Sequence, residues 1–169
     1  MDSSISPEPD IPSSEALPTL AAQTEAIDRL ISLARQRIRV FDHDLSQTGW
    51  NREARVDGLS GFLRGARGRR MDIIVHDVRY AAEACPRLMS LLQRYSHAVT
   101  IYRTGAEARR ATDPLFIVDD RHFLHRFHFE QPRATLGLHQ PDETRLLSNR
   151  FDEIWATGEP GINATQLGL

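Results

Sequence analysis

The sequence contains no lysine, so all 21 of its lysine-or-arginine side chains are arginines. A lysine Schiff base, a P-loop lysine and a serine–lysine pair each need an amine whose pKa can be adjusted, whereas a guanidinium group cannot be deprotonated in a protein. The absence therefore excludes these catalytic arrangements. Arginine remains available to bind anions, but it cannot act as a base.

Cysteine and long apolar runs are also scarce. Cys85 is the only cysteine, which excludes an internal disulfide. No stretch approaches the roughly 20 apolar residues that cross a bilayer, and the N-terminus lacks the basic region and apolar run of a secretory signal. We therefore expect a protein of the reducing cytoplasm that has no membrane partner.

The length and composition indicate one soluble globular domain, since the chain has 169 residues, of which 40% are hydrophobic and 26% charged. Residues 1–18 hold four of the 23 acids, four prolines and no arginine, which predicts a disordered acidic tail. The remaining chain has 21 arginines against 19 acids, a balance that does not indicate a strongly polyanionic partner. We expect an α/β domain over residues 19–156 and a C-terminal extension over residues 157–169.

Apolar residues follow helical and strand spacings in turn from Thr19 onward. Helices are predicted after a cap at Thr19, over Asn51–Ala66, from Pro86 to Tyr95, and over Glu143–Trp155. Strands are predicted over Arg37–Phe41, Met71–Val75, Ala98–Tyr102, Leu115–Val118, His122–Phe129 and Ala134–Leu138. Three strands separated by helices favour right-handed crossovers. The predicted fold is α/β, with a mixed, mostly parallel central sheet flanked by helices on both faces.

Polar side chains follow the predicted parallel strands, where ligands bind in open sheets. They are Asp42, His43, Asp44, His76, Asp77 and Arg103. Arg126 and His128, two positions apart on a later strand, are expected to border the same crevice and to offer a fork for phosphate or carboxylate beside a titrating group. The alternative is that these groups cap helices and pair with one another in a structural network.

Two other clusters have less distinct chemistry. The densest basic patch, Arg64, Arg67, Arg69 and Arg70, is suited to nucleic-acid phosphates, but no aromatic residues are interleaved with it, so a solvated helix end is favoured. A second cluster has histidines at positions 122, 125 and 128. Residues three apart on a strand point to opposite faces, so we predict no metal site there and no cofactor.

Five strings, FDHDLS, CPRLMSLL, DPLFIVDDRHFLHRFHF, FDEIW and TQLGL, resemble an uncharacterised bacterial family of degenerate phospholipase D-like domains. Some members of that family are associated with acetyltransferases. The order of the predicted elements is also similar to that of one phospholipase D-like domain. The resemblance implies that fold, a homodimer in which two motif strands meet at a twofold axis, and an acetyltransferase-associated partner protein.

Active members of the superfamily carry a His-x-Lys-x4-Asp strand, in which histidine attacks phosphorus and lysine holds the phosphate. Placing the motif's acid on Asp120 puts Asp113 at the histidine position, and placing it on Asp119 puts Thr112 there. The lysine position cannot be filled in either register, and a Gly-Ser-x-Asn segment does not follow. The strand-end carboxylate remains, so Asp120 joins the candidates for the cleft.

We therefore predict a catalytically degenerate domain that binds a partner protein or a small anionic ligand in an accessory or regulatory role. One alternative is an enzyme with a non-standard site, built from Asp42, Asp44, His76, Asp77 and His128, that acts on phosphoester or acyl substrates. Another alternative is nucleic-acid binding through the arginine patch.

Overall fold

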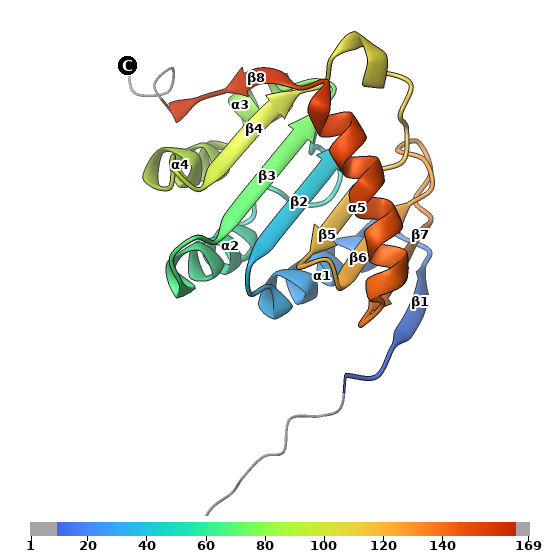
Figure 1. Cartoon of the computed structure of the whole chain (residues 1–169). Coiled ribbons are helices and arrows are strands. Elements are labelled where there is room, and N and C mark those ends of the chain that lie inside the picture. Colours follow the sequence, from blue (N-terminus) through green and yellow to red (C-terminus); the bar gives the residue numbers. More distant parts are fainter. Residues whose placement is uncertain (1–9, 165–169) are drawn as a thin grey trace, which may run out of the picture.

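The computed structural model describes residues 10–164 and contains one open sheet of eight strands (Figure 1). The strands are β1 (Ser13–Leu17), β2 (Arg37–Asp42), β3 (Arg70–Val75), β4 (Val99–Arg103), β5 (Leu115–Val118), β6 (His122–Arg126), β7 (Ala134–Leu138) and β8 (Glu159–Ile162). Their order across the sheet is β1-β7-β6-β5-β2-β3-β4-β8. The helices are α1 (Leu20–Leu33), α2 (Glu53–Gly65), α3 (Arg79–Ala84), α4 (Pro86–Arg94) and α5 (Pro141–Ala156), with a 3₁₀ turn η1 (Ala106–Ala108).

The predicted helices and strands are present, with ends that differ by a few residues. Helix α1 begins after Thr19, whose Oγ1 accepts a hydrogen bond from the Ala22 amide at 3.0 Å, so the predicted cap is confirmed. Strand β6 ends at Arg126, three residues before the predicted end. The six-residue helix α3 was not predicted, because it is too short for a periodic pattern.

The sheet is mostly antiparallel, so the prediction of a mostly parallel sheet is wrong. Only β2–β3 and β3–β4 pair in parallel, and the other five pairings are antiparallel. Strands β5, β6 and β7 form an antiparallel meander. The turn between β5 and β6 passes through Asp119 and Asp120, which have φ values of 54° and 51°. Aspartate tolerates this left-handed backbone, which lets the chain reverse tightly.

Both edges of the sheet come from segments that we placed outside the α/β domain, one in the predicted disordered tail and one in the C-terminal extension. Residues 13–17 of the predicted tail form β1, which pairs with β7, and residues 159–162 of the predicted extension form β8, which pairs with β4. Edge strands face solvent over much of their surface, so they need no alternation of apolar and polar residues. The rest of the predicted tail, residues 1–9, and residues 165–169 lie outside the described part.

Helices cover both faces of the sheet, as predicted (Figure 1). The larger core lies on the face covered by α1, α2 and α4. Helix α5 covers the other face, where Phe151 and Ile154 pack against Phe41, Ile74 and Ile117. Among the described residues, no helix is long and apolar enough to cross a membrane.

Gly137 in β7 lies opposite Phe123 in β6, and the phenyl ring occupies the space that a β-carbon would need. We expect Gly137→Ala to lower the free energy of unfolding by about 1–3 kcal/mol, because the methyl group overpacks a buried site. Urea denaturation followed by circular dichroism measures the change. Gly61→Ala is the control, because no atom lies within 4 Å of its β-carbon position in α2, so alanine should stabilise the protein slightly. Equal stabilities of the two variants would contradict the role of Gly137.

Candidate functional site

A cleft of about 470 Å³ lies at the carboxyl ends of β2, β3 and β4. The two parallel pairings bring these strand ends to the same edge of the sheet. The lining residues are His43, His76, Asp77, Val78, Arg79, Arg103, Arg109, Thr112 and Phe129. Four of the predicted site residues therefore gather around one cavity: His43, His76, Asp77 and Arg103.

His76 uses both of its ring nitrogens to hold the cleft together. Its Nε2 lies 2.7 Å from the Ala111 carbonyl oxygen and must donate, since that oxygen can only accept. Its Nδ1 lies 2.6 Å from Thr104 Oγ1. Burial lowers the pKa of His76, which favours the neutral ring. His76 therefore fastens the segment after η1 to the end of β4, and neither nitrogen is free to attack a substrate.

His43 is the other histidine of the cleft. Its ring stacks on Phe129 with centroids 4.5 Å apart and meets the ring of His76 edge-on at 5.8 Å. Its Nδ1 is buried and has no hydrogen-bond partner among the described residues. Such an orphaned nitrogen is unusual in a folded protein, and it marks His43 as the imidazole with unused hydrogen-bonding capacity.

The charges in the lining are mainly positive. Arg79 donates to Asp77 through Nη2 at 2.7 Å and lowers the pKa of that carboxyl to about 2. Arg103 pairs with Glu159 at 3.1 Å. Arg109 is exposed and forms no ion pair within the described residues. Three guanidinium groups therefore face one carboxylate in the lining, and Arg109 is uncommitted.

Asp42 and Arg126 lie beneath the cleft, not in its lining. Asp42 is buried, and its Oδ1 accepts from the His43 amide at 2.6 Å. Arg126 donates to the carbonyl oxygens of Gln131 and Phe129 and to the side chain of Gln47. Both residues line a small internal cavity of about 20 Å³, which is large enough for one water molecule. The predicted anion fork at Arg126 is thus used to hold the loop that carries Phe129.

Asp44 and His128 also lie outside the lining. Asp44 accepts from the amide and hydroxyl of Ser46 at 3.0 and 2.6 Å, which closes a turn and does not cap a helix, because α2 begins only at Glu53. His128 accepts from the Glu130 amide through Nδ1 at 3.0 Å, and its ring stacks on Phe129. Each therefore shapes a turn next to the cleft.

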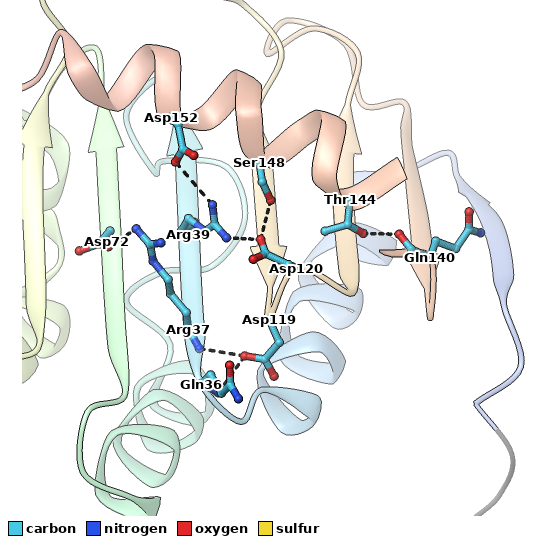
Figure 2. A network of polar contacts seen from close by, with 10 residues as sticks. All are labelled: Gln36, Arg37, Arg39, Asp72, Asp119, Asp120, Gln140, Thr144, Ser148 and Asp152. Carbon is cyan, nitrogen blue, oxygen red and sulfur yellow. Dashed lines mark hydrogen bonds and ion pairs between the residues drawn. The ribbon is translucent and has the colours of Figure 1, made fainter. Parts of the chain in front are cut away.

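Asp120 lies at the opposite end of the sheet, so the prediction that it contributes to the cleft is wrong (Figure 2). Strand β5 runs antiparallel to β2, which places the end of β5 beside the beginning of β2. There Asp120 pairs with Arg39 and accepts from Ser148 Oγ at 2.7 Å. Its neighbour Asp119 accepts from the backbone amides of three residues at 2.7–2.8 Å, namely Arg35, Gln36 and Arg37. Both acids of this turn are structural.

The two registers of the motif place Asp113 or Thr112 at the histidine position, and these residues have different surroundings. Thr112 lines the cleft, whereas Asp113 accepts from His125 at 2.8 Å and from Arg150 of α5 at 2.9 Å. Burial alone would raise the pKa of Asp113, but these two donors outweigh it and lower the pKa to about 2. Asp113 therefore anchors α5, and neither residue supplies an imidazole to the cleft.

The histidines considered for metal binding do not converge. The Nδ1 of His122 accepts from the His139 amide at 3.0 Å, while His125 pairs with Asp113. Within residues 10–164, no three histidine, cysteine, aspartate or glutamate side chains come together in a way that could hold a metal ion.

Sequence reasoning missed the other residues of the cleft, namely Val78, Arg79, Arg109, Thr112 and Phe129. Arg109 lies just after η1, in a polar stretch without periodicity. Its position depends on the hydrogen bond between His76 and Ala111, which joins residues 35 positions apart. The pair of adjacent arginines after β4, Arg109 and Arg110, was a local signal for it.

Solved structures define the class of this fold. Nuc from Salmonella typhimurium, described as a phospholipase D family member, matches with a TM-score of 0.65 and 15% identity, over 89% of this chain and 99% of that chain. Phosphatidylserine synthase from Haemophilus influenzae matches with a TM-score of 0.59 and 16% identity, over 96% of this chain and 42% of that one. An archaeal chromatin protein, described as binding DNA in a novel mode, matches with a TM-score of 0.65 and 10% identity, over 88% of this chain and 54% of that one.

The fold is therefore phospholipase D-like, as the sequence resemblance implied, and the chain spans only about half of the chromatin protein. At these identities the likeness concerns the fold alone. The chain belongs to the family described as a domain of unknown function, DUF7931, whose model matches residues 19–167. A comparison with curated protein sequences gives no match.

Asp42 makes the stability of the protein depend on pH. Burial raises its pKa from 3.8 to about 6, so between these values the folded state retains a proton that the unfolded state releases. The contribution of Asp42 to the free energy of unfolding should therefore fall by about 3 kcal/mol as the pH rises from about 4 to above 6. In Asp42→Asn this contribution should be absent, while the amide oxygen still accepts from His43.

Urea denaturation of both proteins at a series of pH values tests this expectation. The difference in unfolding free energy between wild type and variant should change across this pH window in favour of the variant. A constant difference across the window would contradict a raised pKa at Asp42.

Proposed function

We propose that this domain is a catalytically degenerate phospholipase D-like module that binds a small anionic ligand, a phosphate ester or a carboxylate, in the cleft at the strand ends. Its role would be accessory or regulatory. The observation that supports this proposal is the set of three arginines, Arg79, Arg103 and Arg109, around a cavity in which the only lining carboxylate is already paired.

The chemistry of the lining suits an anion. Guanidinium groups donate forked, charge-assisted hydrogen bonds to phosphate and carboxylate oxygens. Arg109 has no competing acid among the described residues, and Arg103 needs only to leave an exposed pair with Glu159, an interaction worth little. Val78 and Phe129 add an apolar wall, so an organic anion fits better than a bare inorganic one.

The same lining argues against the superfamily's usual reaction. That reaction needs an imidazole to attack phosphorus, but both nitrogens of His76 are occupied and Thr112 lies at one of the candidate motif positions. The alternative function, an enzyme acting on phosphoester or acyl substrates, would have to use His43, whose Nδ1 is unpartnered.

Three further expectations accompany this proposal. We propose that the protein acts in the cytoplasm, that it forms a homodimer, and that its partner is a protein associated with acetyltransferases. The last two follow from the family resemblance. Measurement of the mass in solution tests the dimer, and affinity capture of partners from native cytoplasm tests the association.

Binding of an organic phosphate tests the cleft directly. We expect phenyl phosphate, titrated calorimetrically, to bind the wild type, and Arg109→Ala to weaken binding about tenfold or more, because a hydrogen bond to a charged group contributes about 1.5–3 kcal/mol. Arg110→Ala is the matched control, since this exposed neighbour removes the same charge but does not line the cleft. Equal affinities of the two variants, or no binding by the wild type, would refute the proposal.

A turnover assay separates binding from catalysis. With bis(p-nitrophenyl) phosphate and a p-nitrophenyl ester as substrates, we expect the purified wild type to release no p-nitrophenol above the buffer rate. Turnover that is lost in a folded His43→Ala variant would replace the binding proposal with the enzyme alternative.

A further inference from the structure

A second cleft lies at the opposite end of the parallel strands. It has a volume of about 460 Å³ and lies where α2 leads into β3 and α4 leads into β4. The side chains that carry charge or an aromatic ring in its lining are Arg64, Arg67, Arg69, Arg70, Tyr95 and His97. Since β3 has six residues, the two clefts lie about 20 Å apart along the strand. They are therefore separate sites.

The four arginines in this lining are not equally free. Arg64 and Arg67 are exposed and make no ion pair within the described residues. Arg69 donates to the Phe62 carbonyl at 2.9 Å, and its guanidinium lies 5.3 Å from the centre of the Phe62 ring. Arg69 thus shapes the wall of the cleft, whereas Arg64 and Arg67 remain available to a ligand.

The four arginines of this cleft carry more positive charge than the nearby helix C-termini and Asp72 neutralise. Helices α2 and α4 both end beside this cleft, and each C-terminus is equivalent to roughly half a negative charge. Arg70 lies 3.4 Å from Asp72, which it shares with Arg37. After the two helix ends and this acid are counted against four guanidinium groups, a surplus of about two positive charges remains. No acidic residue lines the cleft.

The fold also supplies the aromatic rings that the arginine segment itself lacks. Tyr95 and His97 belong to the connection between α4 and β4, and they line the same cleft as the arginines. The ring of Tyr95 is partly buried against the larger core, which holds it in position, and its hydroxyl lies 3.3 Å from Ser60 Oγ. Guanidinium groups beside aromatic rings are the combination that binds single-stranded nucleic acids, because the cations contact phosphates and the rings stack on bases.

We propose that this arginine cleft binds single-stranded nucleic acid. Arg64 and Arg67 contact the backbone phosphates, and a base stacks on Tyr95. The contacts are few, so the affinity is modest and falls steeply with salt. The arginine cleft lies at the other end of the parallel strands from the cleft at the carboxyl ends of β2, β3 and β4, and neither proposal depends on the other.

Fluorescence anisotropy with a labelled twelve-residue oligothymidylate tests the phosphate contacts. We expect the wild type to bind at about 50 mM salt, and Arg64→Ala/Arg67→Ala to bind about tenfold or more weakly, with a salt slope smaller by about 1.4, or 0.7 for each lost contact. The control is Arg29→Ala/Arg133→Ala, which removes the same charge at two exposed positions outside the cleft. No binding by the wild type, or equal losses in both double variants, would overturn the proposal.

Two further comparisons test the stacking contact. Tyr95→Leu should weaken binding, whereas Tyr95→Phe should retain it, because phenylalanine preserves the ring. A duplex of the same length should bind more weakly than the single strand, because its bases are not free to stack. Equal binding by Tyr95→Leu and Tyr95→Phe, or tighter binding of the duplex, would refute the single-strand assignment. Oligonucleotide binding that is weakened by Arg109→Ala and not by Arg64→Ala/Arg67→Ala would place the strand in the cleft at the strand ends and overturn this proposal.

Discussion

The buried guanidinium group of Arg39 links three elements of this fold, namely strand β2, the turn between β5 and β6, and helix α5. Arg39 on β2 is 4% exposed, and it pairs with Asp120 of the β5–β6 turn and with Asp152 of α5 (Figure 2). The guanidinium is buried, whereas the carboxylates of Asp120 and Asp152 are 62% and 60% exposed, so the buried charge is compensated from the surface of the protein. Arg39 therefore links the meander, the central strand β2 and helix α5, in addition to the backbone pairing of the sheet and the apolar packing of α5. Asp119, next to Asp120, adds three backbone hydrogen bonds to the same junction.

This arrangement uses the acids of the motif strand for architecture and leaves the opposite end of the sheet for ligands. At that end the histidines are restrained, since His76 is bonded through both nitrogens and His43 is stacked on Phe129. Of the arginines there, Arg109 forms no ion pair among the described residues, and Arg103 is exposed. A site with restrained imidazole rings and an available guanidinium group is suited to recognise an anion, because recognition needs donors, whereas phosphoryl transfer also needs a nucleophile.

The sequence predicted those features that depend on local residues. The cap at Thr19 and the central strands follow from patterns within a few residues. The gathering of His43 and His76 follows from the rule that the ends of parallel strands meet at one edge of a sheet. The errors come from pairings between distant segments. The direction of β5 relative to β2 decides where Asp120 lies, and no local pattern encodes it. The edge strands were missed because solvent-facing strands need no apolar alternation.

The candidate sites, too, include residues that only contacts between distant segments bring together. Arg109 and Phe129 reach the cleft at the strand ends with the help of long-range hydrogen bonds, one from His76 to the Ala111 carbonyl and one from the Phe129 amide to the Thr112 carbonyl. Tyr95 is separated from the arginine segment by α3 and α4, although it lines the same cleft. A single sequence shows which residue types are present, but the fold decides which of them share a cavity.

The two edge strands have a consequence for how copies of this chain meet. Strand β1 has five residues between Pro12 and Pro18, and β8 has four residues, one of them Pro160. Proline cannot donate a backbone hydrogen bond, and so short a strand offers few groups to a neighbouring chain. Joining of two sheets edge to edge is therefore disfavoured on both sides. Self-association would have to use the helical faces or the ends of the strands, and this protects the protein against growth into continuous intermolecular sheets.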